Sequence, residues 1–149
     1  MKEKMPEIAI TTDIIVGFPG ETEEDFLHTL NALEQIEYDN IYSFIYSKRK
    51  GTPAATMEDP TSDEEKSHRF KRLLDTQSNI SNRKNQEYLG RVISVLVEGR
   101  SKTDEEKLTG RNEKNRLVHF SGDDSLIGKS VNVKIIKADT FSLMGELVE

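Results

Sequence analysis

A glycine-rich segment near the start of the chain has the residue types of a ligand-binding turn. Residues 17–21 read Gly-Phe-Pro-Gly-Glu and follow the apolar run 8–16, which includes Asp13. Glycines let a ligand approach the main chain, and the N-terminus of a following helix favours a negative group. Ligands of α/β folds bind at the carboxyl ends of parallel strands. The segment is therefore a candidate rim of a binding site, although spacing alone favours a tight turn without a ligand.

A second polar segment follows the next apolar run. It begins with Tyr46 and Ser47 and continues through Lys48, Arg49 and Lys50. Cations directly after a buried strand would face the same rim and could meet a carboxylate or a phosphate. A solvated turn explains the segment about equally well.

The elements that must position these residues follow from the apolar patterns. Residues 8–16 predict a strand buried on both faces, and residues 40–47 predict a second strand rich in aromatic and β-branched side chains. Between them, Thr22 can cap an amphipathic helix that extends to about Ile36. This order is typical of a βαβ unit with a parallel sheet.

A long helix is expected after the loop 48–60. Ser62 and Glu65 have the spacing of a capping box, and the helix should extend to about Tyr88 and stop at Gly90. Beyond it the apolar period changes to that of strands. Five short strands are expected at residues 92–98, 108–111, 117–120, 130–136 and 141–148. Their number and length predict a five-stranded antiparallel β-barrel of OB-like size.

A basic loop interrupts the predicted barrel and is the third candidate site. Its cations and amides are Arg111, Asn112, Lys114, Asn115 and Arg116. His119 and Phe120 would add stacking surfaces, and a barrel with such a loop can bind RNA. A solvated loop with scattered charge is the alternative.

Composition excludes several kinds of chemistry. The chain has 149 residues and no cysteine, which excludes disulfides, a thiolate nucleophile and a cysteine-ligated cluster held by this chain. Its three histidines are far apart, so we expect no metal site. No apolar run approaches the roughly 20 residues of a membrane span, and the first residues lack the apolar stretch of a secretory signal. We therefore expect a cytoplasmic protein without a membrane partner.

Charge is distributed unevenly along the chain. Residues 1–75 carry 9 Lys and Arg against 16 Asp and Glu, whereas residues 76–149 carry 12 against 11. The second half, close to neutral in sum, can still present a basic face to a polyanion.

The motifs together resemble those of a known family. Residues 12–26 and 42–55 resemble the radical-SAM methylthiotransferases, and the region from about Asn82 resembles the TRAM domain that ends those enzymes. Residues 109–120 are most similar to the MiaB-type, tRNA-modifying branch of the family. The resemblance covers nearly the whole chain, with several long motifs in the right order.

The resemblance implies a fold, an activity and cofactors. Family enzymes combine a methylthiotransferase domain, a radical-SAM partial TIM-like barrel and a TRAM domain. With two 4Fe-4S clusters and S-adenosylmethionine, they add a methylthio group to the 2-carbon of isopentenyladenosine in the tRNA anticodon loop. By carry-over, the residues near S-adenosylmethionine are Asp13, Gly17, Pro19, Gly20, Glu21, Ser47 and Arg49. The family's cluster cysteines are missing, so we expect this chain to be part of a longer parent enzyme, to bind no cluster and to be inactive by itself.

Three interpretations of the chain remain open. In the first, residues 1–60 are the C-terminal part of a radical-SAM barrel, residues 61–89 link, and residues 90–149 form the RNA-binding TRAM domain. In the second, the chain is a free-standing RNA-binding module, and a protein–protein adaptor is a more distant third. A remnant of a larger barrel should expose an unpaired strand edge at residues 8–16, which predicts a homodimer through that edge.

Overall fold

The computed structural model describes residues 4–102, 104 and 106–148. These form two compact units, one made of residues 9–80 and the other of the described residues in 1–8 and 81–149. Each unit is described by itself.

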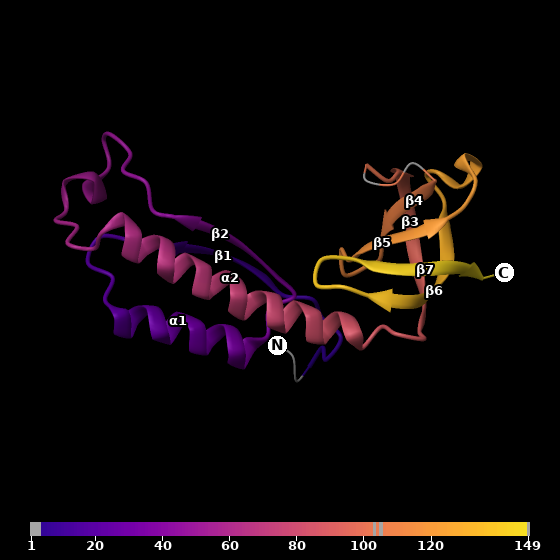
Figure 1. The fold of residues 1–149 in the computed structure, drawn as a ribbon, viewed down its shortest axis with the longest axis horizontal. Helices are drawn as coiled ribbons and strands as arrows, with labels where there is room; N and C mark the ends of the chain where they lie inside the picture. Colours follow the sequence, from indigo (N-terminus) through magenta and orange to yellow (C-terminus); the bar gives the residue numbers. More distant parts are fainter. Residues whose placement is uncertain (1–3, 103, 105, 149) are drawn as a thin grey trace. The chain divides into compact units, whose positions relative to one another are not determined.

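The first unit contains the predicted βαβ arrangement (Figure 1). Its elements are β1 (Thr11–Val16), α1 (Glu23–Ile36), β2 (Asn40–Ile45), the short 3-10 helix η1 (Pro53–Thr56) and the first part of α2 (Asp63–Gln86). Strands β1 and β2 pair in parallel over six residues, from Thr11 opposite Asn40 to Val16 opposite Ile45. The predicted parallel pairing is confirmed.

Side-chain caps explain where the helices begin. Thr22 Oγ1 accepts a hydrogen bond from the Asp25 N–H at 3.1 Å, and the Asp25 carboxylate accepts one from the Thr22 N–H at 3.0 Å. Ser62 Oγ accepts from the Glu65 N–H at 3.1 Å in the same way at the start of α2. The Glu65 carboxylate pairs with Arg69 at 2.5 Å. Both predicted helix starts are thereby confirmed.

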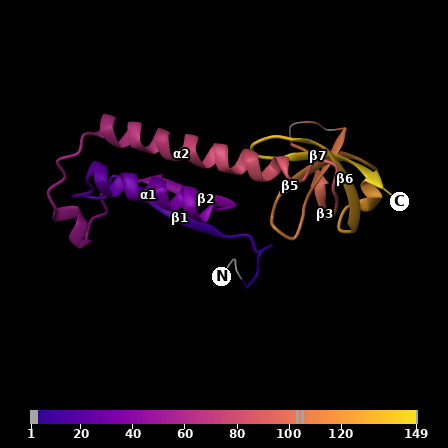
Figure 2. The same ribbon diagram turned by 90° about the horizontal axis from the view of Figure 1, so that it is seen from below.

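One face of the two-stranded sheet packs against both helices (Figures 1 and 2). The buried residues of this core are Val16, Phe26, Leu33, Ile41, Leu73 and Ile80. The expectation that residues 8–16 form a strand buried on both faces is wrong for the described structure, because side chains on the other face of the sheet are open to solvent. Ile15, Tyr42 and Phe44 are each at least half exposed there, at 54, 50 and 59%.

Within the described residues β1 pairs with β2 alone, and the homodimer at its other edge stays a prediction.

The second unit is a closed β-barrel. Its described strands are β3 (Val92–Arg100), β4 (Lys107–Arg111), β5 (Leu117–Ser121), β6 (Ser130–Ala138) and β7 (Leu143–Val148), with the 3-10 helix η2 (Asp124–Leu126) before β6. Alternate residues point inward, and the buried core includes Val95, Val97, Leu108, Val118, Phe120, Val133, Ile135 and Leu143.

The strand order β3-β4-β5-β7-β6 corrects the prediction of a wholly antiparallel barrel. Strands β5 and β7 pair in parallel, from Val118 opposite Leu143 to Phe120 opposite Gly145. The cause is geometric, because a closed ring with an odd number of strands cannot reverse direction at every neighbour. The other described pairs in the barrel are antiparallel.

The C-terminal end of α2 holds the hairpin between β6 and β7. Asn85 is 2% exposed, and its amide donates to the carbonyls of Asp139 at 2.7 Å and Thr140 at 3.1 Å. Gln86 donates to the Ala138 carbonyl at 2.8 Å. These bonds satisfy main-chain acceptors in the hairpin that strand pairing leaves open.

We expect Asn85→Ala to destabilise the barrel unit by about 1–3 kcal/mol, because two carbonyls lose a buried donor. Urea denaturation followed by circular dichroism measures the loss. The matched control is Gln35→Ala on the exposed surface of α1, where we expect a change within about 0.5 kcal/mol. An Asn85→Ala protein as stable as the unsubstituted chain would contradict this view of the hairpin.

Candidate cofactor rim and nucleic-acid groove

The Gly17–Glu21 segment forms a tight turn directly after β1. Gly17 and Gly20 have φ angles of 74° and 88°, in the left-handed region that favours glycine. The Glu21 N–H donates to the Phe18 carbonyl at 2.9 Å and closes the turn. Pro19 is buried and Gly20 is exposed, so the turn presents bare main chain to solvent at Gly20.

Gly17 is also required by packing. A Cβ atom there would lie 2.6 Å from Cγ and 2.8 Å from Cδ of Lys66. The Lys66 ammonium pairs with Asp59, and its hydrogen bond is the main reason why the pKa of Asp59 lies below its usual value. The side chain of Lys66 is therefore held against the turn.

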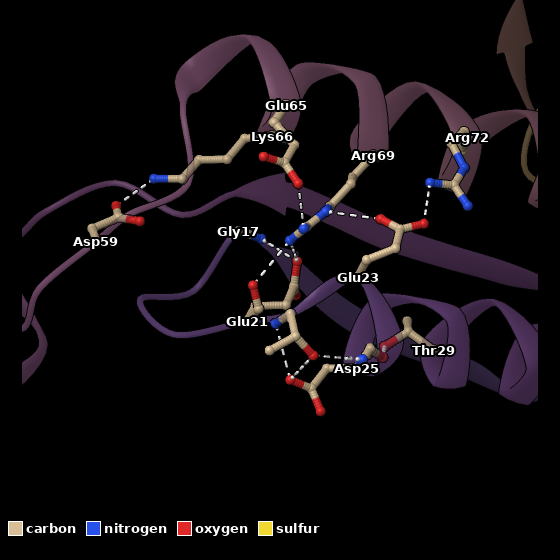
Figure 3. Close-up of polar contacts among 11 residues, drawn as sticks. Gly17, Glu21, Glu23, Asp25, Thr29, Asp59, Glu65, Lys66, Arg69 and Arg72 are labelled. Atoms are coloured by element: carbon tan, nitrogen blue, oxygen red, sulfur yellow. Dashed lines mark hydrogen bonds and ion pairs between the residues drawn. The ribbon is translucent and has the colours of Figure 1, made fainter.

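The Glu21 carboxylate faces inward to the turn and to α2 (Figure 3). Its Oε1 accepts a hydrogen bond from the Gly17 N–H at 3.1 Å and one from Arg69 Nη1 at 3.2 Å. Arg69 also donates to the Glu21 carbonyl at 3.0 Å. The predicted site residues Gly17 and Glu21 are thus brought together, and Arg69 is a residue that the sequence analysis missed. Its spacing from Glu65 was visible, but nothing in the sequence connects it to Glu21, which lies 48 residues away.

The end of β2 supplies the other side of this rim. The Tyr46 N–H donates to the Val16 carbonyl at 2.8 Å, and the Tyr46 ring contacts the Phe18 ring edge-to-face at 5.2 Å between centroids. The Tyr46 hydroxyl is buried and has no hydrogen-bond partner among the described residues. Ser47 and Arg49 follow and are exposed.

Asp13 lies elsewhere. The resemblance implies a place near the cofactor, but Asp13 lies in the middle of β1, opposite Tyr42, and its side chain is exposed. Its side chain shares the solvent-open face of the sheet with Ile15, because alternate residues of a strand point to the same face.

The loop between β4 and β5 is held by its own amides. Asn112 Oδ1 accepts from the main-chain N–H groups of Lys114 at 3.1 Å and Arg116 at 2.9 Å. Asn115 adopts a φ of 60°, and its carbonyl accepts from Arg111 Nη1 at 3.1 Å. These contacts hold the loop in a defined conformation, and they occupy the side-chain oxygen of Asn112.

The predicted cations of this loop have acidic or aromatic neighbours. Arg111 pairs with Glu98 at 3.3 Å, and Lys114 pairs with Glu7 at 2.7 Å. The hydrogen bond from Lys114 is the main reason why the pKa of Glu7 lies below its usual value. The Arg116 guanidinium lies over the Tyr88 ring, 5.6 Å from its centroid, within the range of a cation–π contact.

A groove of about 650 Å³ runs between this loop and the outer face of β3. Its lining includes Arg91, Arg111 and Lys114 as cations and Glu7, Glu98 and Glu113 as anions. The apolar part comes from Val92 and Leu96, which are 55% and 52% exposed. Four of the five predicted RNA-binding residues, Arg111, Asn112, Lys114 and Asn115, are thus in the lining, and Arg116 is not part of it.

The aromatic part of the RNA prediction needs correction. Phe120 is 1% exposed and belongs to the barrel core, because inward and outward residues alternate along β5. His119 is half-buried; burial lowers its pKa, and the nearby Lys107 lowers it further. Neither aromatic group lines the groove.

Two further findings concern metal ligands and helix length in the described residues. No group of three or more His, Cys, Asp and Glu side chains among them could hold a metal ion. Neither of their helices has the combined length and apolar character that crossing a membrane requires.

Comparison with known proteins shows what the chain is similar to. Residues 86–148 match the family described as TRAM domain. The chain is 56% identical over all 149 residues to a protein of Alkaliphilus oremlandii named tRNA-2-methylthio-N(6)-dimethylallyladenosine synthase. Relatives of the same name from Acetivibrio thermocellus and Clostridium perfringens are 57% and 52% identical over 99% and 100% of the chain.

The matched region is a limited part of these relatives. The chain spans about a third of their length, with 32, 31 and 33% of the three proteins covered. The chain is thus similar over its full length to the C-terminal part of proteins named tRNA-2-methylthio-N(6)-dimethylallyladenosine synthase, and its residues 86–148 match the TRAM domain.

Proposed function

We propose that the chain is the C-terminal part of an enzyme that adds a methylthio group to the 2-carbon of isopentenyladenosine in the tRNA anticodon loop. The names of the relatives and the TRAM match support this proposal. Residues 1–60 would contribute the rim of a radical-SAM barrel, residues 61–89 would link, and residues 90–149 would bind tRNA. The exposed apolar side chains of Ile15, Tyr42 and Phe44 favour this over a free-standing module, because a larger barrel would cover them.

The groove on the barrel is the observation that carries the RNA-binding part. Arg111 and Lys114 place two cations at an apolar floor made by Val92 and Leu96. Cations can contact phosphates, and apolar surface can receive an unstacked base. The hydrogen bonds from the loop's main chain to Asn112 Oδ1 hold the loop in one conformation. The loop therefore loses little conformational entropy when its cations bind a ligand.

The turn after β1 is the proposed contact with S-adenosylmethionine. Gly20 has no atom within 4 Å of a Cβ position, so a ligand can approach its main chain. The buried, unpartnered Tyr46 hydroxyl could pair with a polar group of the cofactor. Gly17, Pro19, Gly20, Ser47 and Arg49 would line this rim, while Asp13 is a less suitable candidate because it lies in mid-strand. Bound there, S-adenosylmethionine would supply the reactive group that the resemblance implies.

The two 4Fe-4S clusters do not fit this chain. Such clusters are held by cysteine thiolates, and the sequence contains no cysteine. We therefore propose no step through a cluster on these residues and expect the chain alone to lack methylthiotransferase activity. In the proposed parent enzyme, the clusters would be held by other residues, in the cytoplasm where tRNA is modified.

Replacing Arg111, Lys114 and Arg116 with Ala should weaken tRNA binding by at least about tenfold at low salt. Each lost phosphate contact should also lower the slope of log affinity against log salt by about 0.7–0.9. Fluorescence anisotropy with labelled tRNA over a salt series measures both quantities. The matched control replaces Lys102, Lys129 and Lys137, which carry the same charge outside the groove lining. Equal losses in the two triple variants would show that only net charge matters and that the groove is the wrong site.

Replacing Glu98 with Gln should strengthen tRNA binding. The Glu98 carboxylate pairs with Arg111 at 3.3 Å and would compete with an incoming phosphate. We expect a gain of about two- to fivefold in affinity, comparable to the strength of one surface ion pair. The same anisotropy titration measures it, with Glu146→Gln on β7 as the charge-matched control. An unchanged affinity in Glu98→Gln would mean that Arg111 does not contact phosphate.

A further inference from the structure

Arg69 is a buried cation in the second turn of α2. Its side chain is 3% exposed and contacts three carboxylates of the described residues, Glu21, Glu23 and Glu65 (Figure 3). Glu65 is its neighbour one helical turn earlier, at 2.5 Å. The contacts with Glu21 and Glu23 instead reach across to the turn after β1 and the start of α1.

The contacts with Glu21 fix the turn in two ways. Arg69 Nη1 donates both to the Glu21 carbonyl at 3.0 Å and to its Oε1 at 3.2 Å. The same Oε1 accepts the Gly17 N–H at 3.1 Å. One carboxylate oxygen therefore joins the first and last residues of the turn and connects both to α2.

Stability alone is a poor explanation for this arrangement. Burying a guanidinium among carboxylates costs desolvation, and well-packed apolar side chains often stabilise a fold as well or better. The charged groups instead fix the geometry of the contact. A planar guanidinium with several donors fixes an acceptor in both distance and angle, and here the fixed acceptor is the carboxylate that holds Gly17.

The orientation of Glu21 bears on its role. Its side chain is 14% exposed, and its Oε1 is occupied by Gly17 and Arg69. A carboxylate oxygen used in this way shapes the main chain of the turn.

We infer that Arg69 and Glu21 act as one positioning unit, in which Arg69 orients the Glu21 carboxylate so that it holds the Gly17–Gly20 main chain in the conformation that receives the cofactor. Neither side chain contacts the cofactor itself. This inference rests on the proposed role of the turn in binding S-adenosylmethionine. It also gives α2 a function at the rim, in addition to linking.

The first test measures the turn in the 149-residue chain without any cofactor. In Arg69→Lys the charge remains but the planar fork is lost, so the Gly17 amide should exchange its hydrogen about tenfold faster by NMR, in line with weakening a charge-assisted hydrogen bond. Arg72→Lys is the matched control, because Arg72 pairs with Glu23 at 2.6 Å and does not touch the turn. Unchanged Gly17 exchange in Arg69→Lys would overturn the inference, whatever the turn binds.

The second test measures S-adenosylmethionine affinity in the full-length parent enzyme by equilibrium dialysis. Arg69→Lys and Glu21→Gln should each weaken binding by about tenfold, and the double variant should be no weaker than the worse single variant, because the two residues act together. Additive losses would mean that Glu21 contacts the cofactor directly, which overturns the inference. Faster Gly17 exchange with unchanged affinity in all variants would instead refute the proposed cofactor role of the turn.

Discussion

The buried polar side chains of α2 are the constraint on which both units depend. Lys66, Arg69, Gln77 and Asn85 are each at most 5% exposed, at intervals that keep them on neighbouring faces of the helix. A buried polar group must find a hydrogen-bond partner. Arg69, Gln77 and Asn85 find theirs far away in sequence, whereas Lys66 pairs with Asp59 in the preceding loop. Lys66 and Arg69 hold the loop and turn of the first unit, Gln77 donates to the Tyr38 carbonyl at 2.9 Å, and Asn85 holds the β6–β7 hairpin. The helix therefore orders irregular main chain as well as burying apolar surface.

This polar face also shows why part of the structure could not be predicted from the sequence. Apolar periodicity and caps predicted the strands, both helices and the parallel β1–β2 pair, because these are local signals. Arg69 and Asn85 give no such signal, since a polar residue on a helix normally faces solvent and its distant partner is known only once the chain is folded. The direction of β7 beside β5 was missed for a related reason, because closure of a ring is a property of all its strands together.

In the candidate sites, too, local features were predictable from the sequence and contacts between distant residues were not. Glycines at positions 17 and 20 were recognisable, because few other residues adopt their φ angles, and the cations of the β4–β5 loop were recognisable from their density. The sequence did not reveal that Glu7 and Glu98 face those cations, or that Phe120 points into the core. The resemblance placed Asp13 near the cofactor, whereas in the structure it lies in the middle of β1 with its side chain exposed. Residue types thus predicted the regions of chemistry, while pairing and burial depended on contacts between distant residues.

The parallel β5–β7 junction has a mechanical consequence. It aligns three residue pairs, from Val118 with Leu143 to Phe120 with Gly145, whereas β3 with β6 aligns five. Parallel ladders are slightly weaker per residue than antiparallel ones, and local opening begins where contacts are fewest. The β5–β7 pairing is thus the weakest strand pairing of the described barrel. On heating, the hydrogen bonds between β5 and β7 should therefore break first, while the other strand pairings of the barrel stay intact.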